Sequence, residues 1–219
     1  MLSFSRCARA ALVLAVVATA VASAQNRHGV GLFNPTDLGL LESPDRDNWQ
    51  KPDQIMDSLG IADGAKVADV GAGGGYFTVR LARRVGPNGT VWAEDVQAAM
   101  LEAIKRRVAK ENLRNVRYGQ GTGVDPLLPA GTLDAVLIVE TYREIQYGNP
   151  LLFLRNVRAA LREGGRLGIV DYKKGDGGPG PDGARPDPDT IIAVAERAGL
   201  RLAKRESFLP FQFFLVFVK

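Results

Sequence analysis

The sequence predicts an α/β protein built around a doubly wound, mostly parallel sheet. From Lys66 onward, short apolar segments alternate with amphipathic segments that repeat with helical spacing, and this alternation is typical of a sheet with helices on both faces. Residues 133–139 (LDAVLIV) form the long apolar run expected of a buried parallel strand. The last two predicted strands are separated only by a short turn at Leu209-Pro210, which is too short for a crossover helix and therefore predicts an antiparallel pair.

Each element follows from a local pattern that a glycine or proline ends. Strands are expected at residues 66–70, 90–93, 115–118, 133–139, 166–170, 200–207 and 211–218. Helices are expected at residues 53–59, 76–85, 97–112, 150–161 and 190–198, the last of them capped by Asp189. Residues 173–189 contain five glycines and four prolines, so we expect a loop, which serves either as a lid or as a plain surface connection.

The N-terminal segment predicts export. Arg6 and Arg9 precede an uncharged run at residues 10–22, and Ala22-Ser23-Ala24 matches a small-residue cleavage site. The run is shorter than the roughly 20 residues that a membrane span requires. We therefore expect a cleaved signal peptide at residues 1–24, with an uncleaved anchor or a transit peptide as the alternatives. An arm that is extended or made of short turns should follow at 25–48, and one domain at 49–219. The expected location is periplasmic or secreted, with no membrane span after cleavage.

Rare residues exclude several kinds of chemistry. The chain has one cysteine, Cys7, and one histidine, His28, both near the N-terminus. The predicted domain therefore has no thiolate nucleophile, no Cys/His metal cluster and no histidine base. For this reason we expect no metal site. The net charge of +4 is small and no long basic run occurs, so we also expect no nucleic-acid partner.

A glycine-rich turn joins the first predicted strand to its helix. Gly71, Gly73 and Gly75 permit positive φ and allow a ligand to approach the backbone, although many such turns are only tight turns. A dinucleotide fingerprint would require a third glycine where Tyr76 stands. Asp69 lies two residues before the turn, where a carboxylate suits a cationic or amine-bearing ligand rather than a pyrophosphate.

A second acidic position supports a nucleoside site. Asp95, preceded by Glu94, ends the second predicted strand and lies twenty residues after Gly75. A carboxylate there can accept hydrogen bonds from both ribose hydroxyls, although an acid at a strand end can also be merely solvated. Together the turn and the acid predict a nucleoside cofactor without a pyrophosphate.

These residues resemble the class I, Rossmann-like S-adenosylmethionine-dependent methyltransferases. The first two motifs of that family match residues 67–77 and 91–97, the next two match 121–129 and 133–142, and the turn before the fifth strand matches 161–167. Within the family the chain is similar to a group of predicted exported methyltransferases, through residues 49–52 and 208–217. The resemblance implies a seven-stranded sheet with an antiparallel last strand and S-adenosyl-L-methionine as the cofactor.

The resemblance also implies roles for individual residues. Asp69 would face the amino group of the cofactor, Asp95 would hold the ribose and Val96 would pack on the adenine. Glu140 would border both cofactor and substrate, and Trp49 and Lys51 would close over the cofactor's carboxylate end. The full set of expected cofactor-binding residues is Trp49, Lys51, Asp69, Gly71, Gly73, Gly75, Tyr76, Asp95, Val96 and Asp125.

The chain departs from the family at two places. The family's usual acid near the adenine amine falls at Val124, with Asp125 beside it, and a common Tyr-His-His sequence is replaced by Tyr142-Arg143-Glu144. Methyl transfer needs a general base only when the acceptor must lose a proton first. Among Glu140, Tyr142, Glu144 and Asp171, we take the first three as the catalytic candidates, with a structural or binding role as the alternative for each.

The predicted function is S-adenosylmethionine-dependent methyl transfer, by in-line displacement, to a small-molecule acceptor. The main alternative is an exported protein that binds the nucleoside cofactor without turnover. A nicotinamide-dependent oxidoreductase is a further alternative, which Tyr76 and the C-terminal strand pair disfavour.

Overall fold

The computed structural model describes residues 32–41, 43–175 and 185–219, and residues Phe33–Lys219 form one compact unit. Its strands are β1 (Lys66–Val70), β2 (Thr90–Glu94), β3 (Val116–Gly119), β4 (Leu133–Val139), β5 (Leu161–Tyr172), β6 (Arg201–Glu206) and β7 (Gln212–Val218). Its helices are the 3₁₀ helix η1 (Pro35–Leu41) and the α-helices α2 (Arg46–Gln50), α3 (Pro52–Ser58), α4 (Tyr76–Val85), α5 (Ala98–Lys110), α6 (Tyr142–Ile145), α7 (Pro150–Ala160) and α8 (Pro188–Arg197).

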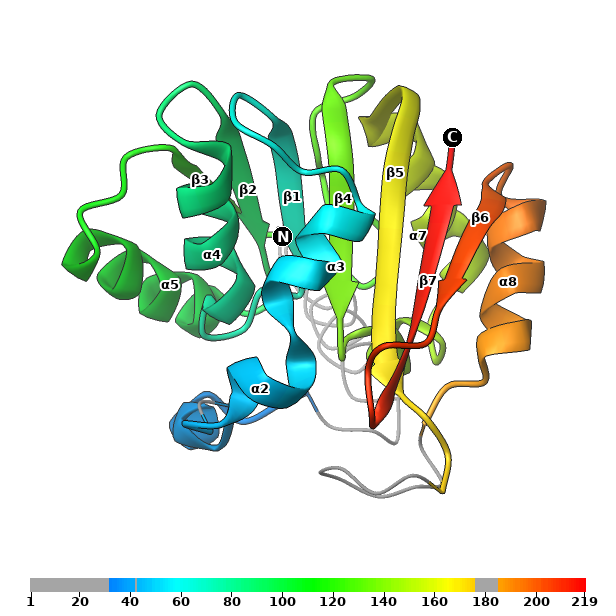
Figure 1. Cartoon of the computed structure of the whole chain (residues 1–219), viewed down its shortest axis with the longest axis horizontal. Coiled ribbons are helices and arrows are strands. Elements are labelled where there is room, and N and C mark those ends of the chain that lie inside the picture. The colour runs from blue at the N-terminus through cyan, green and yellow to red at the C-terminus, as the bar shows by residue number, and fades with distance from the viewer. Residues whose placement is uncertain (1–31, 42, 176–184) are drawn as a thin grey trace, which may run out of the picture. The chain divides into compact units, whose positions relative to one another are not determined.

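The seven strands form one sheet in the order β3-β2-β1-β4-β5-β7-β6 (Figure 1). All pairings from β3 to β5 are parallel. Strand β7 runs antiparallel to both of its neighbours, β5 and β6. The predicted doubly wound, seven-stranded sheet with an antiparallel last strand is therefore confirmed.

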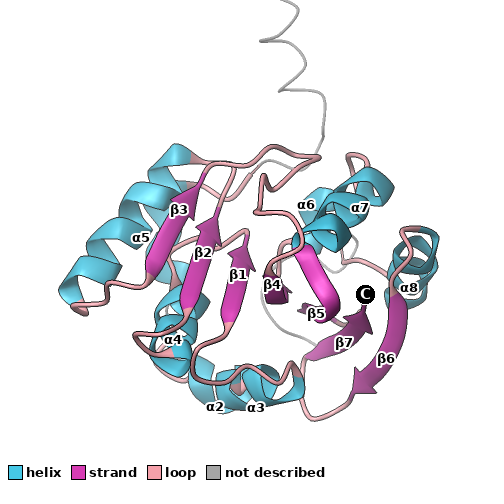
Figure 2. Cartoon of the chain, turned by 90° about the horizontal axis from the view of Figure 1, so that it is seen from above, coloured by secondary structure: helices cyan, strands magenta, loops and turns pink. Residues whose placement is uncertain are grey.

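Helices cover both faces of the sheet and bury its apolar side chains. Figure 2 shows α3 and α4 on one side of the strands and α6 and α7 on the other. The first face packs α3 and α4 against alternate residues of the central strands, such as Val67 and Leu137, and the second packs α7 and α8 against Val136 and Ile138. Successive residues of a strand point to opposite faces, which explains why the central strands are apolar throughout.

Several boundaries differ from the prediction. Strand β5 begins at Leu161, which pairs with Leu133, and a register shift then accommodates the residues before Arg166. Gly164, with φ of 73°, lies in that irregular stretch. Helix α8 is capped by Asp187, whose side chain accepts a hydrogen bond from the Thr190 amide, so the expected cap at Asp189 is wrong.

Three short helices were not expected: η1, α2 and α6. Residues 25–48, predicted as an arm that is extended or made of short turns, thus contain η1 and most of α2 within their described part. The predicted signal peptide at 1–24 lies outside the described residues, as does the middle of the glycine- and proline-rich loop, residues 176–184. None of the described helices combines the length and hydrophobicity needed to cross a bilayer.

Candidate cofactor and active site

The glycine turn lies where β1 ends and α4 begins, at the carboxyl edge of the sheet. Gly71, Gly73 and Gly75 all have positive φ, of 67°, 53° and 81°. A side chain at Gly71 would also meet the Thr141 side chain, because a Cβ there would lie 2.3 Å from Thr141 Oγ1. The turn therefore needs glycine both for its backbone conformation and for its close approach to the end of β4.

The backbone amides of this turn donate hydrogen bonds to buried acidic side chains. The Gly73 amide donates to Asp95 Oδ2 (3.0 Å), and the Gly71 amide donates to Glu94 Oε2 (3.3 Å). Asp95 Oδ1 accepts a second bond from the Gln97 amide (2.9 Å). In a dinucleotide site the turn and the helix N-terminus would bind the anionic pyrophosphate. Here the side chains of Glu94 and Asp95 accept the hydrogen bonds of the Gly71 and Gly73 amides, so these two amides are not available to an anion.

Burial raises the pKa values of these acids. Desolvation, together with the neighbouring Asp95 charge, raises the pKa of Glu94 to about 8. The pKa of Asp69 is raised to about 6, mainly by burial, although the Thr78 hydroxyl donates to its Oδ2 (2.6 Å). Glu94 Oε1 is buried and has no hydrogen-bond partner in the described part of the chain. This acidic, desolvated environment favours a neutral or cationic ligand over a phosphate.

The loop after β3 borders the same acids. A Cβ on Gly121 would lie 2.1 Å from Glu94 Oε1. The loop is closed on itself, since the Thr122 amide donates to the Asp125 carbonyl (2.8 Å) and Asp125 Oδ1 accepts from the Leu127 amide (2.9 Å). Half-buried Val96 follows Asp95 directly. The expected adenine-binding residues Val96 and Asp125 thus lie on the two segments that follow β2 and β3.

The catalytic candidate Glu140 lies just after β4 in a strained backbone conformation, with φ of 56°. Its Oε1 accepts hydrogen bonds from Gln50 Nε2 (2.9 Å) and Gln212 Nε2 (2.8 Å), and its Oε2 lies 3.7 Å from the Arg46 guanidinium. Gln212 reaches this edge because β7 is antiparallel, so its first residue pairs with Tyr172, the last residue of β5. Positive φ in a non-glycine residue is uncommon and often marks a functional position.

The other two catalytic candidates, Tyr142 and Glu144, differ in their surroundings from each other and from Asp171. Tyr142 is buried, and desolvation raises its pKa to about 12. The Glu144 carboxylate is paired with Arg143 at 2.8 Å. Asp171 is buried at the end of β5; desolvation raises its pKa to about 7, and its Oδ2 has no hydrogen-bond partner among the described residues. Asp171 therefore combines a pKa of about 7 with a buried oxygen that accepts no hydrogen bond from the described residues.

Helix α2 lies against this edge of the sheet (Figure 1). The Trp49 ring packs on Tyr172 and Phe211, with ring centroids 6.3 and 6.2 Å apart. Lys51, which follows α2, directs its ammonium away from Glu140 to the Phe208 carbonyl (2.9 Å). The structure therefore brings Trp49 into the candidate site but holds the Lys51 ammonium at the β6–β7 connection.

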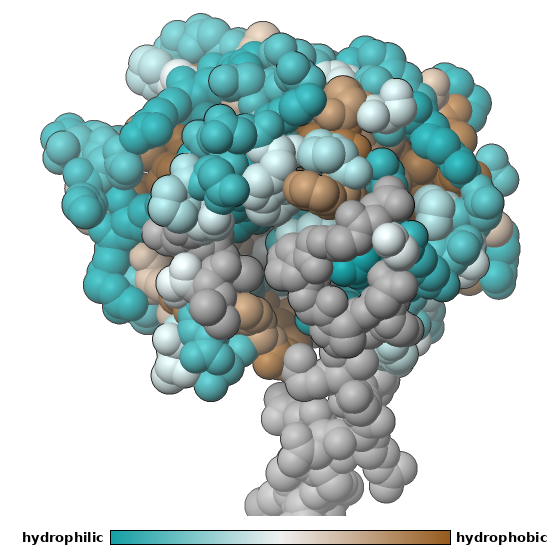
Figure 3. Space-filling view, turned by 60° about the horizontal axis from the view of Figure 1, so that its bottom comes forward, coloured by the Kyte–Doolittle hydropathy of each residue, from teal (hydrophilic) through white to brown (hydrophobic). Residues whose placement is uncertain are grey.

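The sequence pattern does not predict three residues of the candidate site: Arg46, Gln50 and Gln212. All three are buried polar side chains that converge on Glu140. Their only sequence signal is a polar residue inside an otherwise apolar segment, as for Gln212 before FFLVFV. Figure 3 brings this end of the molecule forward and shows hydrophobic and hydrophilic residues side by side on its described surface.

Comparisons with known proteins agree with this geometry. Residues 67–165 match the family model described as "Methyltransferase domain". The structure resembles a SAM dependent methyltransferase from Aquifex aeolicus, with a TM-score of 0.79 and 27% identity, over 85% of this chain and 98% of that one. Residues 67–165 therefore form a methyltransferase domain, and the fold is that of the class I, Rossmann-like S-adenosylmethionine-dependent methyltransferases.

Curated relatives match the methyltransferase domain over part of their length. The ubiquinone/menaquinone biosynthesis C-methyltransferase UbiE of Pasteurella multocida (strain Pm70) is 34% identical over 54% of this chain, and the nocamycin O-methyltransferase of Saccharothrix syringae is 33% identical over 53%. The chain spans less than half the length of these two relatives, at 44% and 41%. A geranyl diphosphate C-methyltransferase from Streptomyces coelicolor A3(2), 15% identical with a TM-score of 0.65, shares the fold.

The residues of the methyltransferase domain fit its cofactor. S-adenosylmethionine carries an adenosine, a sulfonium and an amino-acid tail, but no phosphate. The Gly71 and Gly73 amides already donate to the side chains of Glu94 and Asp95, so these backbone groups are not available to bind a phosphate. Within the described ranges, no cluster of three or more His, Cys, Asp or Glu side chains could hold a metal ion.

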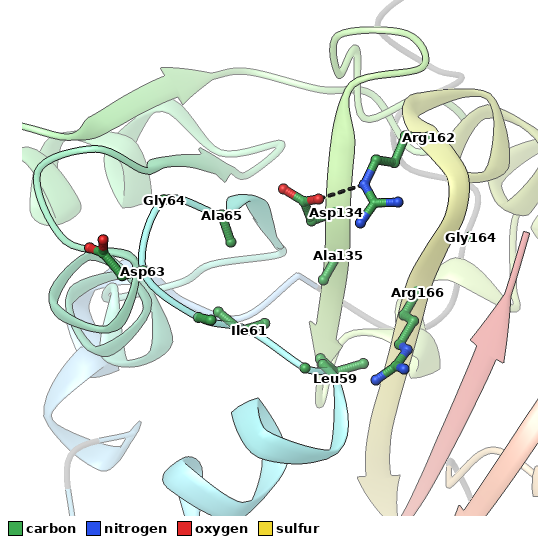
Figure 4. A pocket seen from close by; sticks show the side chains of 12 residues that line it. Leu59, Ile61, Asp63, Gly64, Ala65, Asp134, Ala135, Arg162, Gly164 and Arg166 are labelled. Carbon is green, nitrogen blue, oxygen red and sulfur yellow. Dashed lines mark hydrogen bonds and ion pairs between the residues drawn. The ribbon is translucent and has the colours of Figure 1, made fainter.

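One cavity of the methyltransferase domain lies away from these residues. Its volume is about 400 Å³, and it is lined by the segment before β1 and by the starts of β4 and β5, at the amino edge of the sheet. Figure 4 shows Asp134 paired with Arg162 at this cavity, with Arg166 nearby. None of the predicted cofactor-binding or catalytic residues lines it.

Proposed function

We propose that this protein transfers the methyl group of S-adenosylmethionine to a small-molecule acceptor. One observation carries the proposal: the Gly71 and Gly73 amides of the glycine turn are bound by the carboxylates of Glu94 and Asp95. That arrangement supports a nucleoside cofactor without phosphates and disfavours a nicotinamide dinucleotide. The family match over residues 67–165 supports the same cofactor.

The cofactor supplies the reactive methyl group, and the protein supplies position and environment. Asp95 accepts hydrogen bonds from ribose hydroxyls through the lone pairs that the Gly73 and Gln97 amides do not use. The end of β5 is buried, and a site shielded from water there does not oppose a reaction in which the sulfonium charge disappears. An acceptor that must lose a proton would find a base in Asp171, whose Oδ2 has no partner among the described residues.

Two measurements test the proposal. Isothermal titration calorimetry should show binding of S-adenosylhomocysteine and no binding of NAD; binding of NAD alone would overturn the assignment. An assay for S-adenosylhomocysteine release should then be run with candidate acceptors. Demethylmenaquinone is a sensible first acceptor, because Demethylmenaquinone methyltransferase of Staphylococcus aureus (strain Newman) is 30% identical over 54% of this chain.

A second candidate function is cofactor binding without turnover. It is favoured because two of the catalytic candidates already bind other side chains of the protein. Glu140 Oε1 accepts hydrogen bonds from Gln50 and Gln212, and Glu144 is paired with Arg143. Under this alternative S-adenosylmethionine binds, but its methyl group is not transferred to any acceptor. A single acceptor that releases S-adenosylhomocysteine at a catalytic rate would exclude it.

A further inference from the structure

The cavity at the amino edge of the sheet is the second place where charged and apolar side chains converge. Its walls are the segment 59–65, which joins α3 to β1, and the first residues of β4 and β5. Its volume of about 400 Å³ falls within the range of small-molecule sites. The cofactor and acceptor of the proposed function belong to the opposite edge, so neither of them accounts for this cavity.

Arg166 lines the cavity with most of its hydrogen-bond donors unused. Its side chain is half-buried, and its Nη1 donates to the Ser58 carbonyl at the end of α3 over a long 3.3 Å. Within the described residues its other N–H groups have no hydrogen-bond partner, and no carboxylate pairs with it. Partial burial of a guanidinium without a counter-charge is costly. The cavity therefore contains a cation that lacks an anion.

A second guanidinium, that of Arg162, lies at the same wall. Its Nε donates to Asp134 Oδ1 and its Nη1 donates to the Glu163 carbonyl (2.9 Å), which leaves Nη2 available. Asp134 Oδ2 accepts from the Lys66 amide (2.8 Å), so both oxygens of this acid are used. Figure 4 shows the two guanidiniums on the β5 side of the cavity. Because Asp134 neutralises Arg162, Arg166 gives this wall its net positive charge.

The rest of the lining is largely apolar. A Cβ on Gly60 would lie 2.9 Å from Arg166 Nη1, so this glycine leaves the guanidinium uncovered on that side. Asp63 lies across the cavity from the two guanidiniums (Figure 4), with its Oδ1 beside Gly86. The aliphatic side chains of the lining are Leu59, Ile61, Ala62, Ala65 and Ala135. One wall thus attracts an anion, and the remaining surface suits an apolar group.

We propose that this cavity binds a small organic monoanion, a carboxylate attached to an apolar body, with the carboxylate on Arg166 and Arg162. A guanidinium can donate two parallel hydrogen bonds to a carboxylate. One negative charge matches the one uncompensated cation, whereas a phosphate monoester would bring further negative charge close to Asp134. The apolar body would be removed from water by the aliphatic lining. This inference does not depend on the proposed function.

The test compares phenylacetate with phenylacetamide, which has the same body without the charge. Each is titrated into the ¹⁵N-labelled protein, and binding is followed by NMR. The amide signals of residues 59–65 and 162–166 should move, and those of residues 71–75 should not. We expect a millimolar dissociation constant for so small a ligand. The carboxylate should bind at least about tenfold more tightly than the amide, because only the carboxylate forms charged hydrogen bonds.

Arg166→Gln should weaken phenylacetate binding by about tenfold or more and leave the affinity for phenylacetamide within about twofold. Arg83→Gln is the matched control, since it removes the same charge from an arginine that pairs with Glu111 away from the cavity. Both affinities of this control should stay within about twofold of the wild-type values. An effect of Arg166→Gln no larger than that of Arg83→Gln would overturn the inference.

The wild-type protein alone also decides the question, whether or not the variant folds. Equal binding of phenylacetate and phenylacetamide, signals that move only in the glycine turn, or no movement at the cavity up to about 20 mM ligand would each refute the site. Titration of S-adenosylhomocysteine, which tests the proposed function, is a separate measurement at the opposite edge of the sheet, so the two can fail independently.

Discussion

Asp95 is the side chain that we propose links the glycine turn to the ribose of the cofactor. It is buried, and each of its oxygens accepts one backbone amide, from Gly73 and Gln97. Because each carboxylate oxygen has a second lone pair, both remain able to accept a hydroxyl. Asp95 therefore organises the turn and can contact the ribose at the same time.

Replacing Asp95 by alanine should weaken S-adenosylhomocysteine binding by about 1–3 kcal/mol, the value of charged hydrogen bonds. Calorimetric titration measures this directly. Asp134→Ala is the control, since Asp134 pairs with Arg162 at the opposite edge of the sheet and should leave the affinity unchanged. Unchanged affinity in Asp95→Ala would remove Asp95 from the site.

Glu94 makes stability depend on pH. Its pKa is about 8 in the folded protein, against an ordinary value of 4.5, because burial disfavours the charged carboxylate. Between these two pH values the folded protein keeps a proton that the unfolded chain releases, so the free energy of unfolding falls as the pH rises. Glu94→Gln mimics the protonated acid and should remove this part of the decrease.

Urea unfolding of Glu94→Gln and wild type at about pH 5.5 and about pH 8.5 measures this effect. The free energy of unfolding of Glu94→Gln minus that of wild type should be larger at the higher pH than at the lower pH. Glu102→Gln is the control: Lys105 holds the pKa of this exposed acid below its ordinary value, so both states are ionised throughout this range. An equal difference at both pH values for Glu94→Gln would contradict the assignment.

Local spacing predicts some site residues and not others. Asp69, Asp95 and the turn glycines could be identified because they lie at the ends of adjacent strands, at fixed distances along the chain. Gln50 and Gln212 are 162 residues apart, and only the antiparallel placement of β7 brings them into contact. For Lys51, the left-handed backbone conformation, with φ of 47°, and the Phe208 carbonyl hold the ammonium away from the site.

At the scale of elements, the predicted boundaries agree with the structure within a few residues where glycine or proline ends a pattern. β1, α4 and β4 match the predicted ranges. The helices η1, α2 and α6 span seven, five and four residues, too few to establish a helical period. Their positions follow from tertiary contacts, such as those of Trp49 with Tyr172 and Phe211.

A single substitution in the glycine turn should prevent the cofactor from binding. Gly73→Val should abolish S-adenosylhomocysteine binding, because a branched side chain would cover the backbone and strain a residue with φ of 53°. Gly131→Val is the matched control: Gly131 has φ of 65°, and a Cβ there would meet nothing within 4 Å. Both variants carry similar backbone strain, so binding retained by Gly73→Val would show that the turn does not contact the ligand.

The start of α8 distinguishes two neighbouring acids. Asp187 accepts the Thr190 amide at 2.9 Å, and this hydrogen bond holds the pKa of Asp187 below its ordinary value, whereas Asp189 forms an exposed ion pair with Arg205. An N-cap contributes more to stability than a surface ion pair. Thermal unfolding should show a lower midpoint for Asp187→Ala than for Asp189→Ala, and the opposite order would restore Asp189 as the cap.

At the scale of the whole molecule, the sequence predicted the sheet more fully than the site. The alternation of strands and helices determines the parallel part, and the short connection at Leu209-Pro210 determines the antiparallel strand. The site depends on which residues of five strands and α2 meet at one edge, and the buried polar network around Glu140 has no local signature. Long-range packing decides that network.

We also propose that the protein is exported, from the pattern of Arg6, Arg9, the uncharged run and Ala22-Ser23-Ala24. N-terminal sequencing of protein recovered from outside the cytoplasm should begin at Gln25. Ala24→Leu should slow processing, because the cleavage site requires a small residue there. Exported material that retains residues 1–24 would contradict cleavage.

Strand β7 follows β6 along the chain but lies between β5 and β6 in the sheet. During synthesis on the ribosome, the free edge of β5 therefore has no neighbour until residues 212–218 have emerged, and β6 must wait for the same segment. Until then the apolar edge of β5 is open to pairing with other nascent chains. Translation past β7 completes both the sheet and the polar network, since Gln212 arrives with that strand.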